Sequence, residues 1–236
     1  MKIAVIIPAL NEAETIVQAI RRVPLAPDRI TVVDNGSSDG TSWMARAYGA
    51  RVVATSPPGY GRACLAGMAI NDDAEVLVFM DADLSERPED LSVLLEPILS
   101  GDADLVMGSR GGRGRPWHAD AGTRLCVWLI NRWWGTAYED LGPFRAVRAS
   151  SLWMLDMQDR TWGWTIEMQV KAAEAGLRCL ELPIASGQRA AGTSKISGSI
   201  IGTARAAVRM LQTIIWLRLT RSGRVSRYLN GLSRSP

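Results

Sequence analysis

The chain has 236 residues, 47% of them hydrophobic, and a formal net charge of +3. This length fits one large domain, or one domain with a small appendage, and supplies enough apolar residues for a buried core. No apolar run reaches the roughly 18 to 20 residues of a membrane-spanning helix, which argues against an integral membrane protein. Cys64, Cys126 and Cys179 are odd in number and lack CxxC spacing, so neither a disulfide framework nor a zinc site is expected.

The charge is distributed unevenly along the chain. Residues 1–181 hold 18 basic and 24 acidic residues, whereas the segment after Glu181 holds nine basic residues and no acidic one. A basic segment of this kind indicates an anionic partner, namely nucleic acid, a phosphate ligand or a membrane surface. The apolar run before Pro8 is too short for a signal peptide, so we expect a cytoplasmic protein.

The first half of the chain alternates Val- and Ile-rich runs with helical patterns. Strands are predicted at residues 3–7, 30–33, 51–54, 76–80 and 104–107, and helices at residues 11–23, 40–49, 63–72 and 88–99. Continuous apolar strands separated by helices are typical of a parallel sheet that helices cover on both faces. The predicted class is therefore α/β with a mostly parallel central sheet.

The second half of the chain is more helical and rich in tryptophan. A glycine-rich flexible loop is predicted at residues 111–116, and helices are predicted at 124–134 and 165–176. Apolar residues at helical spacing between Ile200 and Ile215, with Arg205 and Arg209 one turn apart, indicate a basic amphipathic helix. Such a helix can lie among lipid headgroups or pack its apolar face on the domain, and both arrangements stay open.

A polar cluster follows each of the five predicted strands. The clusters are PALNE, DNGSSDGT, PPGYGR, DAD and GSR. Ligands of open α/β sheets bind outside the carboxyl ends of the strands. We therefore expect the five clusters to converge on one crevice.

Asp81 and Asp83 stand one residue apart at the end of the apolar run VLVFM. Like charges this close repel one another unless a positive charge lies between them. Mg²⁺ and Mn²⁺ favour oxygen ligands and commonly bind through one or two carboxylates together with phosphate oxygens. We therefore predict that both residues hold Mg²⁺ or Mn²⁺, which bridges to a diphosphate, although an acidic pair alone is common in turns.

The ordered set of motifs resembles the family 2 glycosyltransferases. The resemblance rests on PALNE, VVDNGSSDGT, GYGRACLAG, DADLSERPEDL, GSR, DLGPFRA and RAAGTSK, and it covers about residues 1–200. The most similar branch resembles dolichyl-phosphate mannosyltransferase and its bacterial polyprenyl-phosphate relatives. The resemblance implies the nucleotide-diphospho-sugar transferase fold called GT-A. The GT-A domain would span residues 1–195, with a nucleotide-binding half up to about residue 115 and an acceptor half after it. A basic helix and tail would follow at 196–236.

The same resemblance implies the residues that bind the donor. A nucleotide-diphosphate sugar would be held by the PALNE loop, the following acidic turn, the glycine-rich loop and the DAD motif. The implied donor residues are Pro8, Ala9, Asn11, Glu12, Asp34, Gly61, Arg62, Asp81 and Ala82. Glu12 has an alternative role as an acidic residue at a helix start, and Gly59 is expected to let a backbone approach closely.

On the acceptor side, the resemblance implies that Arg110, Arg124 and Arg145 contact a phosphate. Arg189 and Lys195, in the pattern RxxGxSK, would stabilise the departing diphosphate and are implied, with Asp83, as catalytic. Glu167 has three possible roles, as an acceptor-side residue, as a structural residue or as a general base.

The function that the resemblance implies is inverting, metal-dependent transfer of a sugar to a polyprenyl phosphate, by a peripheral protein on the inner membrane face. One alternative is a transferase with a soluble sugar or small phosphorylated acceptor, and another is a non-catalytic nucleotide- or membrane-binding module. Nucleic-acid binding is disfavoured because the basic residues form no known module. Hydrolysis by a Ser-His-Asp triad is also disfavoured, because His118 is the only histidine and no GxSxG motif accompanies it.

Overall fold

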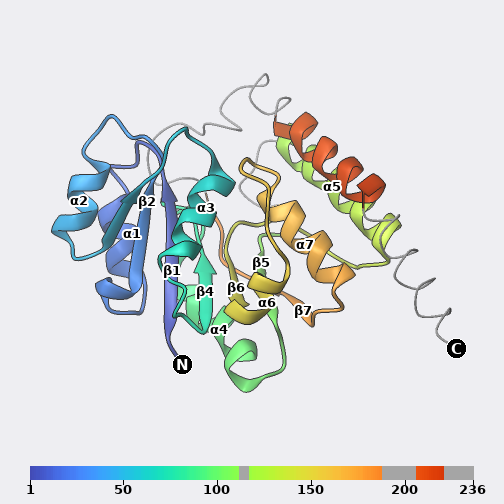
Figure 1. The fold of residues 1–236 in the computed structure, drawn as a ribbon, viewed down its shortest axis with the longest axis horizontal. Coiled ribbons are helices and arrows are strands. Elements are labelled where there is room, and N and C mark those ends of the chain that lie inside the picture. The colour runs from blue at the N-terminus through green and yellow to red at the C-terminus, as the bar shows by residue number, and fades with distance from the viewer. Residues whose placement is uncertain (112–116, 188–205, 221–236) are drawn as a thin grey trace, which may run out of the picture.

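A computed structural model of the chain describes residues 1–111, 117–187 and 206–220 (Figure 1). A seven-stranded sheet with the order β3-β2-β1-β4-β6-β5-β7 lies at its centre. The strands are β1 (Ile3–Ala9), β2 (Ile30–Asp34), β3 (Arg51–Ala54), β4 (Val76–Phe79), β5 (Leu105–Ser109), β6 (Arg145–Arg148) and β7 (Cys179–Pro183). Only β6 runs against its neighbours β4 and β5, while the other pairs are parallel. The predicted mostly parallel sheet is confirmed.

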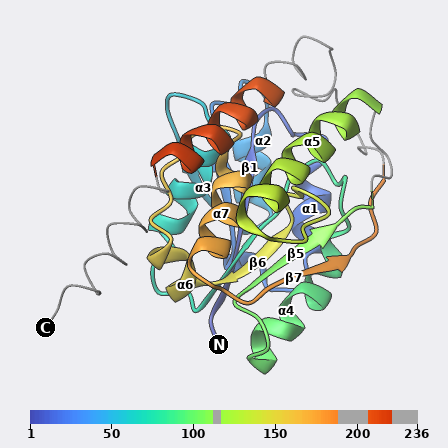
Figure 2. The same cartoon turned by 90° about the vertical axis from the view of Figure 1, so that its right-hand side faces the viewer.

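Helices cover both faces of the sheet, as expected (Figures 1 and 2). They are α1 (Ile16–Arg22), α2 (Thr41–Ala47), α3 (Tyr60–Ala69), α4 (Leu91–Ser100), α5 (Trp117–Trp134), α6 (Ala149–Met154), α7 (Trp164–Glu174) and the helix over residues 206–220, with short 3₁₀ turns η1 (Pro27–Arg29) and η2 (Pro88–Asp90). One hydrophobic cluster joins α3, α5, α6, α7 and helix 206–220 to one face of the sheet. A second cluster joins α1, α2 and α4 to the other face.

The five predicted strands are present, but β6 and β7 were not predicted. The sequence of β6, RAVR, has an arginine at each end, and β7, CLELP, has a glutamate at its centre and no buried residue, so neither is a continuous apolar run. Helix α1 begins at Ile16 rather than at residue 11, because Asn11 has a φ of 51° and lies in the loop. The expected helix patterns are otherwise present, with shifted ends.

Helix 206–220 packs on the domain beside α5 (Figure 2). Ile214 and Leu217 are fully buried in the cluster that also contains residues of α5 and α7. Arg218 lies 5.9 Å from the ring centroid of Trp134, which belongs to the last turn of α5. The structure therefore shows the helix packed on the domain through Ile214 and Leu217, whereas Val208 and Ile215 of the predicted apolar face are exposed. Residues 200–205 of the predicted helix lie outside the described part. None of the helices in the described ranges is long and apolar enough to cross a membrane.

Candidate functional site

The loops that follow β1 and β2 bind each other at the carboxyl edge of the sheet. The backbone N–H of Asn11 donates to Ser37 Oγ at 2.9 Å, and that of Glu12 donates to Thr41 Oγ1 at 2.9 Å. Pro8 and Ala9 are buried at the end of β1, whereas Asn11 is exposed. Two of the predicted donor-binding segments are thus adjacent, as the topology required.

Asp34 ends β2 and is 8% exposed. Its carboxylate accepts hydrogen bonds from Ser42 Oγ and from the backbone N–H of Ser37, the latter at 2.8 Å. Burial raises the pKa of Asp34, but these hydrogen bonds outweigh burial and lower the pKa below its ordinary value. Asp34 is therefore an ionised, oriented acceptor at the sheet edge.

The glycine-rich loop before α3 is covered by the backbone of residues 159–161. A Cβ on Gly59 would lie 2.3 Å from the carbonyl oxygen of Arg160, and one on Gly61 would lie 2.1 Å from that of Asp159. The close approach expected at these glycines is therefore made here by the chain itself. Arg62 follows them, and its buried Nε has no hydrogen-bond partner in the described part of the chain.

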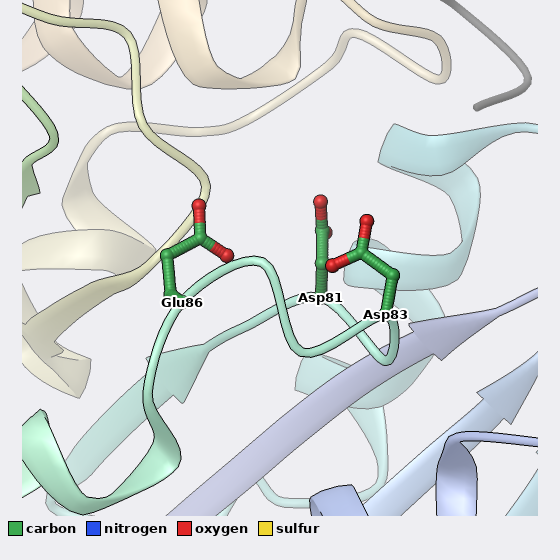
Figure 3. Close-up of side chains that lie close together, drawn as sticks. All are labelled: Asp81, Asp83 and Glu86. Atoms are coloured by element: carbon green, nitrogen blue, oxygen red, sulfur yellow. The ribbon is translucent and has the colours of Figure 1, made fainter. Parts of the chain in front are cut away.

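Asp81, Asp83 and Glu86 form an acidic cluster after β4 (Figure 3). Each contributes an oxygen atom that lies within 4.8 Å of the other two. The loop is shaped by Leu84, which has a φ of 60°, and by the backbone N–H of Ser85, which donates to Asp83 Oδ1 at 2.9 Å. Asp81 is half-buried, while Asp83 and Glu86 are buried. A set of three carboxyl oxygens of this kind fits a hard divalent cation such as Mg²⁺ or Mn²⁺.

Glu86 was not among the predicted ligands. It lies three residues after Asp83 and is 3% exposed. Burial raises the pKa of Glu86, Arg110 lowers it, Asp83 raises it further, and the net shift is upward. Glu86 is the third acidic residue of DADLSE and was visible in the sequence. Its proximity to Asp81 and Asp83, however, depends on the turn at Leu84.

Arg110 lies between two carboxylates beside the acidic cluster. Its guanidinium contacts Glu86 Oε1 at 3.2 Å and binds Asp140 through Nε at 2.8 Å and Nη2 at 3.1 Å. Burial lowers the pKa of Arg110, but Asp140 and Glu86 raise it more, so the net shift is upward. The structure thus brings Arg110 to the cluster, while its expected contact with a phosphate stays a prediction.

The two other arginines expected at the acceptor phosphate have different partners from those of Arg110. Arg145 is 1% exposed and donates to the carbonyl oxygens of Gly142 and Thr165, and burial lowers its pKa. Arg124 lies on α5, is 77% exposed and pairs with Asp120 at 2.8 Å. Arg110 thus contacts the acidic cluster through Glu86, whereas Arg145 and Arg124 have the partners given above, and binding of a phosphate by any of the three stays a prediction.

Glu167 lies in the first turn of α7 and is buried, with 1% of its surface exposed. Its carboxylate accepts from the backbone N–H groups of Gln158 and Asp159 at 3.0 and 2.7 Å, and pairs with Lys171 at 2.6 Å. These contacts hold the loop that covers Gly59 and Gly61. Of the three roles considered for Glu167, the geometry supports the structural role.

The RxxGxSK segment, with Arg189 and Lys195, lies outside the described residues, as does the side chain of His118. The chain that leads to this segment is anchored at the acidic loop. Ser186 pairs with Glu86 in an antiparallel bridge, and the backbone N–H of Gly187 donates to Ser85 O at 3.0 Å.

Comparison with known proteins gives a consistent result. Residues 4–155 match the family described as "Glycosyl transferase family 2". The chain is 37% identical over 204 residues to an uncharacterized glycosyltransferase of Mycobacterium tuberculosis, covering 85% of this chain and 92% of that protein. It is 32% identical over 231 residues to undecaprenyl-phosphate mannosyltransferase of Micrococcus luteus, covering 86% and 91%.

Among solved structures, glucosyl-3-phosphoglycerate synthase of Mycobacterium tuberculosis, in complex with Mn²⁺, UDP-glucose and phosphoglyceric acid, matches with a TM-score of 0.74. The identity is 24%, and the match covers 92% of this chain and 79% of that one. This likeness confirms the predicted GT-A type of fold. Because the family match spans more than half of the chain and relatives above 30% identity cover most of it, the chain belongs to glycosyl transferase family 2 and is a glycosyltransferase.

Proposed function

We propose that this glycosyltransferase moves a sugar from a nucleotide-diphosphate sugar to a polyprenyl phosphate, with inversion at the anomeric carbon. The undecaprenyl-phosphate mannosyltransferase of Micrococcus luteus, by its name, acts on such an acceptor. The reaction would take place at the cytoplasmic face of a membrane, where the phosphate of the lipid is accessible to a peripheral protein.

The observation that carries the choice of acceptor is the environment of Glu167. A sugar hydroxyl is a very weak acid and needs a general base, whereas a phosphate monoester has a second pKa of about 6 and already offers a nucleophilic oxygen at neutral pH. The carboxylate of Glu167 is bound by two backbone N–H groups and by Lys171. Because these contacts give Glu167 a structural role rather than that of a base, they favour an acceptor that requires no general base.

The donor would lie along the carboxyl edge of the sheet. The loop of Pro8, Ala9, Asn11 and Glu12 would enclose the nucleoside, and the ionised Asp34 would accept hydrogen bonds from its base or ribose. Arg62 lies near the start of α3, and its buried Nε would offer a hydrogen bond to a phosphate oxygen.

The leaving group is a nucleoside diphosphate, whose negative charge grows as the bond to the sugar breaks. Mg²⁺ or Mn²⁺ held by Asp81, Asp83 and Glu86, next to the backbone of Ala82, would neutralise part of that charge. Arg189 and Lys195 would add two fixed positive charges, and Gly187 ties the chain before them to the acidic loop. Arg110 orients Glu86 through their ion pair.

A second candidate is transfer to a small phosphorylated acceptor that is not a lipid. It is favoured by the structural likeness to glucosyl-3-phosphoglycerate synthase, which was solved with phosphoglyceric acid. If a hydroxyl of such an acceptor is the nucleophile, it needs a general base. The contacts of Glu167 leave it poorly suited to that role, which favours the first candidate.

The test incubates the purified chain with radiolabelled nucleotide sugars, Mg²⁺ or Mn²⁺, and either a polyprenyl phosphate in detergent or phosphoglyceric acid. We expect label in the organic phase only with polyprenyl phosphate, and loss of transfer with a chelator. Asp83→Asn should lower turnover by about a hundredfold or more, while Glu89→Gln, at an exposed acid near the same loop, should leave it unchanged.

Label on phosphoglyceric acid alone would favour the second candidate. Absence of transfer to either acceptor with every donor would contradict both candidates and favour a non-catalytic binding module.

A further inference from the structure

The outward sides of α5 and helix 206–220 carry large apolar side chains. The two helices lie side by side in the same direction. Gly122 faces Ala207 near the start of both helices, and Arg218 contacts the carbonyl oxygen of Trp133 near their ends. We call the exposed apolar residues of this pair the two-helix face, which consists of Leu125, Trp128, Val208, Ile215, Trp216 and Leu219.

Helix 206–220 is apolar on two opposite sides, which is unusual for a surface helix. Ile214 and Leu217 are fully buried against the domain, but Ile215, Trp216 and Leu219 are 47%, 52% and 74% exposed. Single exposed apolar residues are normal on a protein surface, and Trp43, Leu99 and Trp153 are examples on α2, α4 and α6. Six exposed apolar residues gathered on two adjacent helices instead mark an interaction surface.

The charges around the two-helix face identify the kind of partner. The two helices hold four arginines, Arg124, Arg132, Arg209 and Arg218, and a single acidic residue, Asp120. The sequence that follows adds Arg221, Arg224 and Arg227 and contains no acidic residue. Apolar and tryptophan side chains with flanking arginines are the composition of helices that lie in the headgroup region of anionic bilayers.

We propose that the two-helix face docks on an anionic lipid bilayer, with both helix axes in the plane of the membrane. This inference deepens the proposed function, since a lipid acceptor must reach the protein from a membrane. Trp128 and Trp216 insert at the level of the headgroups, and the arginines beside them meet lipid phosphates.

A single loop, which contains Asp159 and Thr161, would separate the docked face from the glycine-rich loop on the donor side of the site. Arg209 donates to Thr161 Oγ1 at 3.2 Å, and Thr213 Oγ1 donates to Asp159 Oδ2 at 3.2 Å. The same loop accepts from the backbone of Gly61 at the start of α3 through Thr161 O, at 3.1 Å. A bilayer on the two-helix face is thus next to the segment that covers the glycine-rich loop.

The test measures co-sedimentation of the full chain with vesicles of phosphatidylcholine, with and without about one third phosphatidylglycerol. The triple variant Trp128→Gln, Trp216→Gln, Leu219→Gln removes the centre of the face. The triple variant Trp43→Gln, Trp153→Gln, Leu99→Gln is the matched control, because it changes two exposed tryptophans and one exposed leucine on other helices.

We expect the wild type and the control to bind the anionic vesicles and to detach as salt rises, since salt screens the attraction. The variant of the two-helix face should bind at least about tenfold more weakly, which corresponds to about 1.4 kcal/mol. Equal loss in both variants, or no binding of the wild type, would overturn the proposal. The proposal would also be overturned if light scattering showed a dimer of the wild type and a monomer of the two-helix variant, because a second copy of the chain would then cover the face.

Transfer to a short-chain polyprenyl phosphate in solution separates this proposal from the proposed function. The two-helix variant should keep this activity, whose acceptor needs no membrane. Vesicle binding without any transfer would contradict the proposed function alone, and transfer without vesicle binding would contradict the docking surface alone.

Discussion

The guanidinium of Arg110 is surrounded by carboxylates in a poorly solvated position. It is 12% exposed and lies between Glu86 and Asp140, which are 3% and 5% exposed. Removing one partner of a buried ionic group leaves the remaining charges without compensation, at a cost of about 3 to 5 kcal/mol. Arg110 is therefore a stabilising residue in addition to any role in binding.

We predict that Arg110→Ala lowers the free energy of unfolding by about 3 kcal/mol. Arg22→Ala is the control, because Arg22 and Glu89 form a pair at 2.7 Å whose side chains are 39% and 43% exposed. Solvent screens that pair, so its loss should change the free energy by about 0.5 kcal/mol or less. Urea unfolding followed by circular dichroism measures both, and equal effects would show that the Arg110 network contributes no more than a surface pair.

Glu167 and Lys171 form the other buried ionic pair, at 2.6 Å within α7. If Glu167 is structural, Glu167→Gln and Lys171→Met should both lower the melting temperature by roughly 5 °C or more, with similar losses of activity. A general base would behave differently, since Glu167→Gln would then reduce kcat strongly while the melting temperature stayed near that of the wild type. Thermal unfolding and steady-state kinetics on the same preparations distinguish the two roles.

Among the elements of the fold, those with a continuous apolar pattern were predictable. Strands β1, β2 and β4 are buried along nearly their whole length, so their sequences consist mainly of apolar residues with several Val and Ile. Strand β6 was missed because Arg145 supplies one of its buried positions, which only the carbonyl oxygens of Gly142 and Thr165 make possible. Strand β7 lies at the edge of the sheet and shows no such run.

The meeting of the loops at the carboxyl edge of the sheet was also predictable from the apolar strands, but the contacts between the loops were not. Parallel strands place their carboxyl ends at one edge, so motifs after β1, β2 and β4 had to meet. The sequence could not show that Glu86 turns back toward Asp81, that Arg110 is shared with Asp140, or that the loop at Asp159 covers the glycines. Each of these contacts joins segments whose proximity depends on loop conformation rather than on a repeating pattern.

An ionic contact joins the residue before β7 to the residue before β5. Asp104 accepts from Arg178 Nη2 at 2.8 Å and lies 3.7 Å from Arg148 Nε. The hydrogen bond from Arg178 and the positive charges of both arginines lower the pKa of Asp104. A folded-state pKa below the unfolded one means that the stabilisation is present above the unfolded pKa, about 3.9, and is lost as the pH falls through the folded pKa.

Asp104→Asn should therefore lower the free energy of unfolding by about 1 kcal/mol at pH 7. The difference from the wild type should shrink as the pH falls below about 4, since the wild type then loses the same charge. Urea unfolding at pH 7 and at pH 3 measures this difference. Asp72→Asn, at an exposed acid, is the control, and a difference that stays constant between the two pH values would contradict the assigned cause.

At the scale of the whole molecule, helix 206–220 belongs to the same hydrophobic cluster as α3, α5 and α7. The sequence suggested a domain at 1–195 followed by a basic helix and tail, and left open whether that helix packs on the domain. A helix that did not pack on the domain would unfold independently of it. A helix whose residues are fully buried in the cluster predicts a single cooperative transition instead. The neighbouring isoleucines Ile214 and Ile215 test this, because one is 0% and the other 47% exposed.

Ile214→Ala should lower the free energy of unfolding of the whole chain by about 2 to 4 kcal/mol, because it removes buried methyl groups and leaves a cavity. Ile215→Ala changes the same residue type one position later and should alter it by about 0.5 kcal/mol or less. Urea unfolding is followed by far-ultraviolet circular dichroism and by tryptophan fluorescence. Coincident curves that shift together only in Ile214→Ala would show one cooperative unit, whereas an early transition confined to one probe would mean that the helix unfolds separately from the catalytic domain.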